Sequence, residues 1–197
     1  MGKKRLSEMT LEELWQLFPI VLTEHRPEWA QWYAEEECRL AAVLPADGIA
    51  RISHIGSTAI EGIWAKPIVD ILVETARDAD WTAIRAALCG EGGYICMSES
   101  PERLSFNRGY TEDGFAERVF HLHLRRAGDH DELYFRDYLN AHPDVAREYE
   151  RMKLALWHAY EHDRDGYTAR KAEFVRLHTD RAKRELSGRY PGRGPVS

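Results

Sequence analysis

Two apolar segments of the sequence carry residues that can do chemistry. An aspartate lies within "PIVDILV" at residues 67–73, and two histidines alternate with leucines in "VFHLHLR" at residues 119–125. Side chains alternate between the two faces of a strand, so Asp70, His121 and His123 each lie opposite the apolar residues of their own strand. One carboxylate and two imidazoles suit a divalent transition metal. We therefore expect a shared site for a divalent metal (Mg, Mn or Zn), with Asp70 as the candidate catalytic residue.

Both features also have ordinary structural explanations. An HxH pattern is common on a strand with one solvated face, where histidine is merely tolerated. The carboxylate of Asp70 can instead accept hydrogen bonds from backbone N–H groups of a nearby turn. A buried carboxylate is costly unless it is paired, so either explanation requires a partner for it. The sequence leaves open whether Asp70 fastens a loop or belongs to a site.

A glycine-containing turn, "HIGST" at residues 54–58, precedes the strand that carries the aspartate. Gly56 permits close backbone approach, and the Ser57 hydroxyl and the turn amides, including that of Thr58, can hold a phosphate oxygen. Lys66 lies just before the strand, where it can offset negative charge. No GK[ST] sequence follows, so this is not a Walker loop. We expect Gly56, Ser57, Thr58 and Lys66 to bind phosphate; the alternative is an ordinary turn and a solvated lysine.

Composition narrows the class of protein. The length of 197 residues suits one compact domain, and 44% of the residues are hydrophobic. The formal charge of −6 argues against a partner such as bulk nucleic acid but allows a small anionic ligand in a local basic pocket. Three cysteines without a CxxC pair predict neither a disulfide framework nor a zinc knuckle. No apolar run reaches transmembrane length and the first ten residues lack a signal-peptide core, so we expect a cytoplasmic protein without a membrane partner.

Alternation and turn residues predict a mixed sheet followed by helices, an α+β arrangement. A short strand is predicted at residues 20–24, ahead of the sheet itself. The predicted strands of one sheet, with helices on its apolar face, are residues 50–55, 67–74, 93–98, 103–109 and 117–125.

Helix signals lie on both sides of these strands. A capping box at Thr10, Pro27 at a first helical position and the N-cap Asp80 predict three helix starts. From about residue 130 the chain is helical, and Pro143 begins a new helix after a break. We expect a single domain over residues 1–186, in which about 130–186 form a helical extension, and a flexible tail over residues 187–197.

The order of several motifs resembles the GrpB family of proteins. These motifs are "HIGSTAIEGIWAKPIVDILV", "FNRG", "HLHL", "FRDYLNAHPDVAREYERMK" and "YTARKAEFV", and the resemblance extends from about residue 10 to 186. That family is similar in fold to nucleotidyltransferases. The resemblance implies a nucleotidyltransferase-like mixed β-sheet with helices packed on one face and a C-terminal helical extension. It also implies a nucleotide or another phosphorylated small molecule as the ligand.

The resemblance assigns roles to individual residues. In nucleotidyltransferases a Gly-Ser pair binds the nucleotide phosphates, and two carboxylates at positions i and i+2 of the next strand hold Mg²⁺ with a third from another strand. Gly56 and Ser57 match the turn and Asp70 matches the first carboxylate, but Leu72 stands at the second position. Glu74 points to the same face as Asp70, but it lies one strand repeat, about 6–7 Å, beyond the second position at residue 72. The "HLHL" strand corresponds to the third carboxylate, and its histidines favour a softer metal than Mg²⁺.

The helical extension supplies further cations. Lys153 and Lys171 each follow a tyrosine by four residues, which places an aromatic ring beside a cation on one helix face. Together with Arg136, these lysines can reach a phosphate in a cleft against the sheet. Alternatively, each lysine extends along the edge of the core with its ammonium in water. Strict alternation places Arg118 on the apolar side of its strand.

Three functions remain compatible with these residues. The first is a protein of nucleotidyltransferase fold that binds a nucleotide or related phosphorylated ligand with a divalent metal, and nucleotidyl transfer is the activity that the resemblance implies. Loss of the second carboxylate, at Leu72, supports the alternative of a ligand-binding or protein-interaction module without catalysis. The third is metal-dependent hydrolysis, in which Asp70, His121 and His123 hold a metal whose bound water is the nucleophile.

Overall fold

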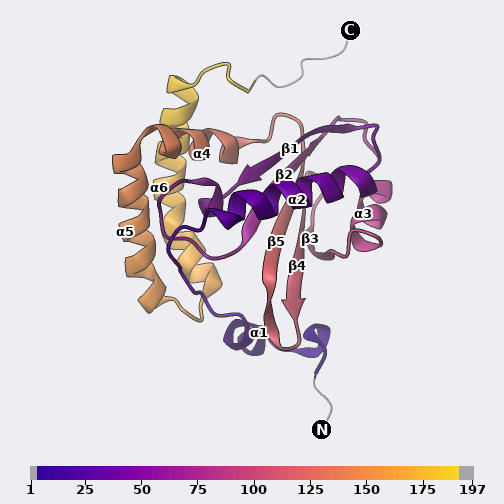
Figure 1. The fold of residues 1–197 in the computed structure, drawn as a ribbon, viewed down its shortest axis with the longest axis horizontal. Helices are drawn as coiled ribbons and strands as arrows, with labels where there is room; N and C mark the ends of the chain where they lie inside the picture. The colour runs from indigo at the N-terminus through magenta and orange to yellow at the C-terminus, as the bar shows by residue number, and fades with distance from the viewer. Residues whose placement is uncertain (1–3, 191–197) are drawn as a thin grey trace.

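A five-stranded mixed sheet forms the centre of the structure, a computed structural model that describes residues 4–190 (Figure 1). In chain order the elements are η1 (Leu6–Glu8), α1 (Leu11–Leu17), α2 (Glu28–Val43), β1 (Ile49–Ile55), η2 (Ser57–Ala59), β2 (Val69–Thr75), α3 (Trp81–Cys89), β3 (Ile95–Glu99), β4 (Arg103–Thr111), β5 (Gly114–Arg126), α4 (Asp131–Ala141), α5 (Pro143–Ala159) and α6 (Arg164–Glu185). The predicted α+β class and the five predicted strands of one sheet are confirmed.

The strands lie in the order β1-β2-β5-β4-β3. β2 and β5 are parallel, whereas the other neighbouring pairs are antiparallel. In the parallel pair Asp70 is opposite His121 and Leu72 is opposite His123. This register places the aspartate and both histidines on the same face of the sheet, because paired residues on neighbouring strands point the same way.

The other face of the sheet is apolar and packs against α2 and α3. Branched and aromatic side chains of β2, β4 and β5 bury themselves there against a tryptophan and a leucine of α2. The strand residues of this core are Val69, Ile71, Val73, Leu104, Phe106, Phe120, Leu122 and Leu124, and all are buried. Each such side chain contributes roughly 1.5–3 kcal/mol relative to exposure, so this layer holds the sheet in place.

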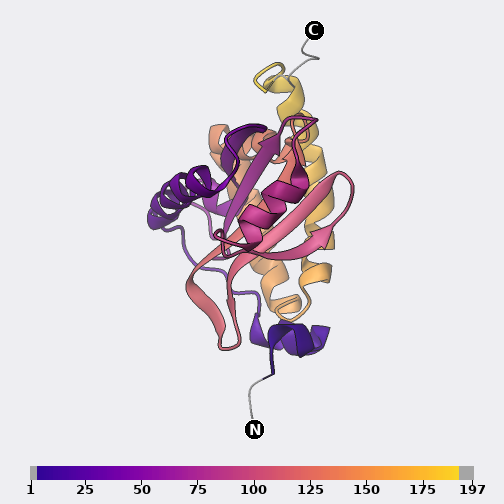
Figure 2. The same ribbon diagram turned by 90° about the vertical axis from the view of Figure 1, so that its right-hand side faces the viewer.

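The C-terminal helices cover the face that carries Asp70. Figure 2 shows α3 in front of the sheet and α6 behind it. Apolar side chains of α4, α5 and α6 pack with Ile60 and Ile63 of the loop after β1, and Leu72 packs with Ile55 and Leu133. The helical extension therefore closes over the polar residues of β2 and β5.

Thr10, Asp80 and Pro143 begin helices as predicted, whereas Pro27 is the N-cap residue of α2 and not its first helical residue. The Thr10 side chain accepts a hydrogen bond from the Glu13 backbone in a capping box before α1. Asp80 accepts from two backbone N–H groups at the start of α3. Pro143 occupies the first turn of α5, where its missing N–H costs no helical hydrogen bond. No helix within residues 4–190 is long and apolar enough to cross a bilayer.

The predicted short strand at residues 20–24 is wrong. This segment makes a single isolated bridge, between Thr23 and Ala65, and forms no strand. Ile20 and Leu22 are buried, and the Ile20 N–H donates to the carbonyl of Glu161 at 2.8 Å. The apolar residues that suggested a strand thus serve the core as a connecting segment, because burial alone does not specify sheet pairing.

Candidate functional site

Asp70, His121 and His123 converge on the face of the sheet beneath the C-terminal helices. Asp70 Oδ1 lies 3.4 Å from His121 Nδ1 and 3.4 Å from His123 Nε2. The parallel register of β2 and β5 brings these atoms together although the two strands are distant in the sequence. The carboxylate therefore has imidazole partners and does not stand alone in the sheet.

These two histidines stabilise the ionised form of Asp70. Burial opposes ionisation of the carboxyl, but the hydrogen bonds with His121 and His123 outweigh burial and keep the pKa of Asp70 well below its usual range. Asp70 is thus ionised at neutral pH. A carboxylate with so low a pKa accepts protons poorly, so it offers a ligand its charge and its oxygens rather than its basicity.

The turn before the aspartate strand presses directly against the carboxylate. Gly56 has a φ of +72°, and a Cβ atom added there would lie 2.3 Å from Asp70 Oδ2. Only glycine therefore fits between the end of β1 and Asp70. The Thr58 hydroxyl donates to the carbonyl of Ile68 at 3.2 Å, which ties the turn to the start of β2.

Substitution of Gly56 by alanine should displace Asp70 and lower the free energy of unfolding by about 1–3 kcal/mol. Gly62 is a matched control, since its φ is +71° and a Cβ atom there would meet nothing within 4 Å. Gly62→Ala should carry the backbone strain alone, so its loss in urea denaturation should be the smaller of the two. Equal losses would contradict the contact between the turn and the carboxylate.

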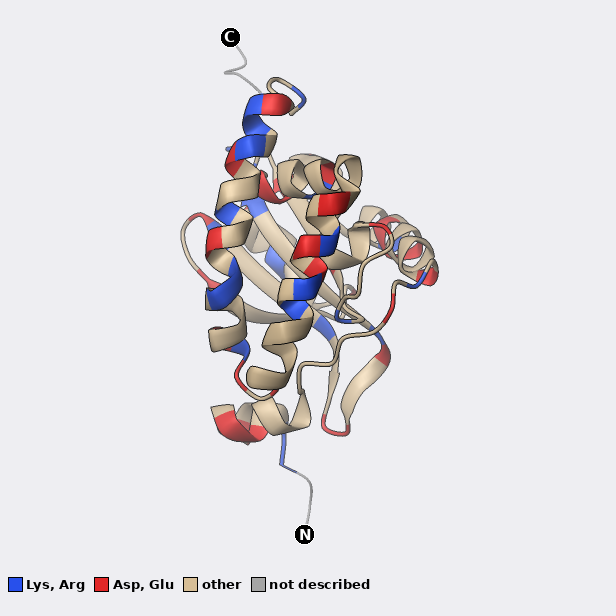
Figure 3. Cartoon of the chain, turned by 90° about the vertical axis from the view of Figure 1, so that its left-hand side faces the viewer, with Lys and Arg blue, Asp and Glu red and all other residues tan. Residues whose placement is uncertain are grey.

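A cavity of about 340 Å³ lies above these residues, between the sheet and helices α5 and α6. Its cationic lining residues are Lys66, Lys153, Arg164 and Lys171. Among the described residues that line it, Asp70 is the only acidic one. Along α5 and α6 as a whole, basic and acidic residues are interspersed (Figure 3). The positive character is therefore a property of the cavity within a chain of formal charge −6.

The three lysines are crowded and desolvated. Burial first, and then the neighbouring Lys171, lowers the pKa of Lys66 and of Lys153 to about 7. Burial lowers the pKa of Lys171 to about 8, and Asp70 partly opposes this change. The ammonium groups of Lys66 and Lys171 lie 4.5 and 4.4 Å from the ring centroid of Tyr167, in cation–π contact. A bound anion would favour the charged form of all three lysines.

The structure shows which cations of the helical extension line the cavity and which do not. Lys153 is only 1% exposed and donates to the backbone carbonyl of Trp64, so its ammonium does not extend into water. Lys171 also lines the cavity. Arg136, in contrast, donates to the backbone of β1, and Arg118 pairs with a carboxylate of α2 on the apolar side of the sheet.

Two residues of the site were not predicted from the sequence. The Tyr110 hydroxyl lies 2.8 Å from His121 Nε2, and Arg164 donates to the same hydroxyl at 2.8 Å. Arg164 is the first residue of α6. No local signal marks either residue, since their proximity to His121 arises from tertiary packing.

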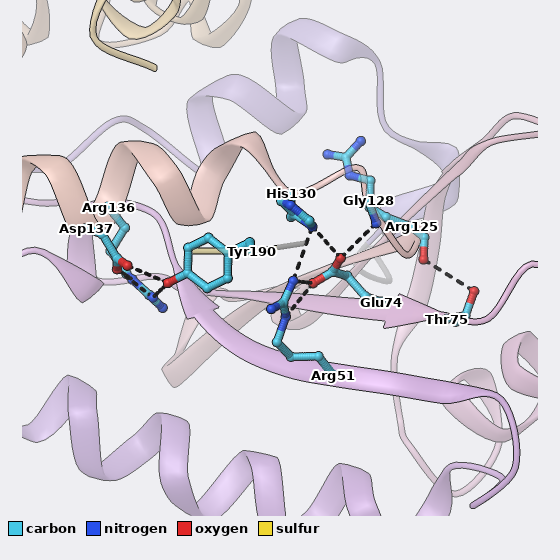
Figure 4. A network of polar contacts seen from close by, with 9 residues as sticks. All are labelled: Arg51, Glu74, Thr75, Arg125, Gly128, His130, Arg136, Asp137 and Tyr190. Atoms are coloured by element: carbon cyan, nitrogen blue, oxygen red, sulfur yellow. Dashed lines mark hydrogen bonds and ion pairs between the residues drawn. The ribbon is translucent and has the colours of Figure 1, made fainter. Parts of the chain in front are cut away.

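The two β2 residues that follow Asp70 on its own face of the sheet, Leu72 and Glu74, supply no second carboxylate to the site. Leu72 is fully buried in an apolar contact with β1 and α4. Glu74 belongs to a separate buried network (Figure 4). Its Oε1 is 2.8 Å from His130 Nδ1, and its Oε2 accepts from Arg51 Nε at 2.6 Å. The negative charge of Glu74 is therefore committed to these partners.

The predicted tail begins beside this network. Residues 191–197 lie outside the described residues. Tyr190 hydrogen-bonds Asp137 and accepts from Arg136 at 3.0 Å (Figure 4). Its ring also lies 4.9 Å from the guanidinium carbon of Arg51. Tyr190, within the predicted tail, thus packs against α4 and β1.

The donor set at Asp70 suits a single transition-metal ion, but its donor atoms already contact one another or Tyr110. Both imidazoles face the same carboxylate oxygen, and the second nitrogen of His121 meets Tyr110. Within residues 4–190 no group of three or more His, Cys, Asp or Glu side chains is arranged to hold a metal ion. A divalent ion at this site would have to replace the contacts between imidazole and carboxylate, so the metal stays a prediction.

Comparison with known proteins identifies the family. The sequence profile described as "GrpB protein" matches residues 19–181. The chain belongs to the GrpB family. A crystal structure of the conserved protein GrpB from Enterococcus faecalis is similar to this GrpB chain with a TM-score of 0.71 and 25% identity, over 84% of this chain and 99% of that chain.

Two curated proteins are similar in sequence to this GrpB chain. A UPF0157 protein of Pseudomonas aeruginosa is 39% identical over 76% of this chain and 62% of its own length. The UPF0157 protein YqkA of Bacillus subtilis is 31% identical over 94% of this chain and 54% of its own length. This chain therefore spans less than two thirds of either relative.

Proposed function

We propose that the cavity beneath α5 and α6 binds the phosphate groups of a small molecule such as a nucleotide. The observation that carries this proposal is the group of four cations around a cavity that contains one carboxylate, within the described residues. Crowding cations in a desolvated space is unfavourable, and a phosphate offsets that cost with charge-assisted hydrogen bonds. The formal negative charge of the chain is consistent with a local site rather than a general affinity for nucleic acid.

The turn after β1 supplies the other side of the proposed site. Ser57 and Thr58 line the cavity, and Gly56 keeps their backbone close to Asp70. The Thr58 hydroxyl donates to a backbone carbonyl, the Ser57 hydroxyl hydrogen-bonds Tyr149, and the Ala59 and Ile60 amides donate within the turn. The proposed donors to a ligand are therefore the Ser57 and Thr58 amides, together with the Ser57 hydroxyl when it turns from Tyr149 to the ligand. Phosphate oxygens would then lie between this turn and Lys171.

Loss of affinity in a lysine variant tests this proposal. Lys171→Gln should weaken binding of inorganic tripolyphosphate, measured by titration calorimetry, by about tenfold or more, because a charge-assisted hydrogen bond is lost. Arg176→Gln is the matched control, since it removes a cation from the exposed side of the same helix, where Arg176 is 71% exposed. The control should bind within about twofold of the original chain. Equal losses in both variants, or no binding to either nucleotide or tripolyphosphate, would overturn the proposal.

Nucleotidyl transfer is a second candidate, favoured by the cluster of Asp70, His121 and His123 beside the cations. Leu72 at the second carboxylate position argues for binding without transfer. Incubation with nucleoside triphosphates and analysis for released pyrophosphate or inorganic phosphate separates these alternatives. Pyrophosphate would indicate transfer, phosphate would indicate hydrolysis, and ligand binding with neither product would indicate a binding module.

A divalent metal belongs to the same proposal. Because an ion would replace the contacts of Asp70 with both imidazoles, we expect Mn²⁺ to bind mainly together with an anionic ligand. Equilibrium dialysis should show Mn²⁺ retention that rises when tripolyphosphate is added and falls about tenfold or more in Asp70→Asn. Retention that is unchanged in Asp70→Asn and in the double variant His121→Ala/His123→Ala would contradict a shared metal site.

A further inference from the structure

A second cavity, of about 680 Å³, lies next to the first, against α1 and the outer strands β3 and β4. Most of its lining is apolar: Leu11, Leu14, Trp15, Phe18, Ile95 and Met97. Leu11, Ile95 and Met97 are between 50% and 59% exposed, which is unusual for large apolar side chains that could have been buried. The volume and lining suit a flat apolar ring better than a phosphate.

One polar group of this cavity lacks a partner. Asn107 lines the cavity and is only 4% exposed. Within the described part of the chain, no group donates a hydrogen bond to its Oδ1 atom. A buried acceptor without a donor is costly, and a donor from a ligand or an ordered water would remove that cost. The missing partner is therefore an N–H or O–H donor.

The two cavities adjoin at Arg164 and Tyr110, which hydrogen-bond each other. Arg164 lines both, and Tyr110 lines the second while it hydrogen-bonds His121 in the first. Asn107 is paired with His121 across β4 and β5, so the two side chains share a sheet face. Neighbouring strands are about 4.8 Å apart, so β2 and β4 are separated by about 10 Å, a distance within the length of a small molecule.

We propose that the second cavity holds a purine-sized ring whose exocyclic amine donates to Asn107 Oδ1, while phosphates of the same molecule occupy the first cavity. This inference rests on the proposed phosphate-binding function. Adenine carries such an amine, and its flat apolar faces match the lining by Leu14, Trp15 and Met97. Arg164, between the cavities, would contact the part of the ligand that links ring and phosphates.

Three probes separate the ring from the phosphates in titration calorimetry of the full chain. ATP carries the amine, purine riboside triphosphate lacks only that amine, and inorganic tripolyphosphate lacks the nucleoside. We expect ATP to bind at least tenfold more tightly than tripolyphosphate, and about threefold to tenfold more tightly than purine riboside triphosphate. Asn107→Leu should abolish the preference for ATP over purine riboside triphosphate and leave tripolyphosphate affinity unchanged.

A second variant, at an exposed residue, tests the same inference without changing the buried Asn107. Ile95 is 50% exposed, so Ile95→Trp narrows the cavity at its edge without a change in the core. It should remove the advantage of both nucleotides over tripolyphosphate. Equal affinity for all three probes in the original chain, or a preference for ATP that survives in Asn107→Leu, would overturn this inference and leave the phosphate site standing. Absence of binding to every probe would instead overturn the proposed function, and this inference with it.

Discussion

Replacement of Glu74 by alanine should lower the free energy of unfolding by about 3–5 kcal/mol, because it breaks a buried charged network at one partner. Glu74 is 1% exposed, and its carboxylate accepts from Arg51, His130 and the Gly128 backbone. The substitution leaves the Arg51 guanidinium without its partner carboxylate and removes the acceptor of a backbone N–H. Urea denaturation followed by circular dichroism at neutral pH measures the loss.

Glu99→Ala is the control for this prediction. Glu99 is paired with Arg85 at 3.1 Å, but both side chains are about half exposed. Solvent screens such a pair, so its removal should change the free energy of unfolding by less than about 1 kcal/mol. Similar losses in the two variants would show that the buried network contributes no more than a surface ion pair.

Affinity for an anion should fall steeply as the pH rises from about 6 to 9. Burial lowers the pKa of Lys66 and Lys153 to about 7 and that of Lys171 to about 8, so these groups lose their positive charge within this range. Each lysine that must be protonated for binding contributes up to about tenfold per pH unit above its pKa. We expect a decrease of roughly a hundredfold or more in total, measured by calorimetry with sulfate, whose own charge is constant.

This loss of anion affinity with rising pH distinguishes the cavity from an ordinary basic surface. Exposed lysines have a pKa near 10.4 and would keep their charge to pH 9. Lys171→Arg should make the decline shallower, because a guanidinium stays protonated throughout this range. An affinity that is constant between pH 6 and 9, or a decline unchanged in Lys171→Arg, would mean that the lysines of the cavity do not hold the anion.

Strand periodicity was enough to place Asp70, His121 and His123 opposite the apolar residues of their own strands. It could not establish that β2 and β5 are neighbours, because pairing between distant segments depends on the whole topology. The resemblance to the GrpB family provided that expectation, and the parallel register shows the contact. The orientation of Lys153 could not be predicted from the sequence either, because a helix face beside the core suits both a buried and a solvated ammonium.

Tyr110 illustrates a different limit. Simple alternation along β4 places Tyr110 on the face opposite Asn107. The pairing of β4 with β5 shifts register between Arg108 and Tyr110, and Gly109 at this shift has a φ of +93°. Between the residue pairs on either side of this shift β4 has one residue and β5 has four, so the register shifts by three residues. An odd shift of this kind breaks the simple alternation of facing for the residues beyond it. The sequence shows the glycine, but a glycine alone does not reveal which way a neighbouring side chain points.

The parallel pairing of β2 with β5 also limits when the cavity can form during synthesis on the ribosome. Asp70 and His123 are separated by 53 positions, and β3 and β4 are made between them. Long-range pairings of this kind form late, because a long loop must close before any contact offsets its entropy. Lys171, in α6, is made later still, after the strands and α5. A nascent chain therefore carries an uncovered polar sheet face until α6 has been made, and it gains its cationic pocket only then.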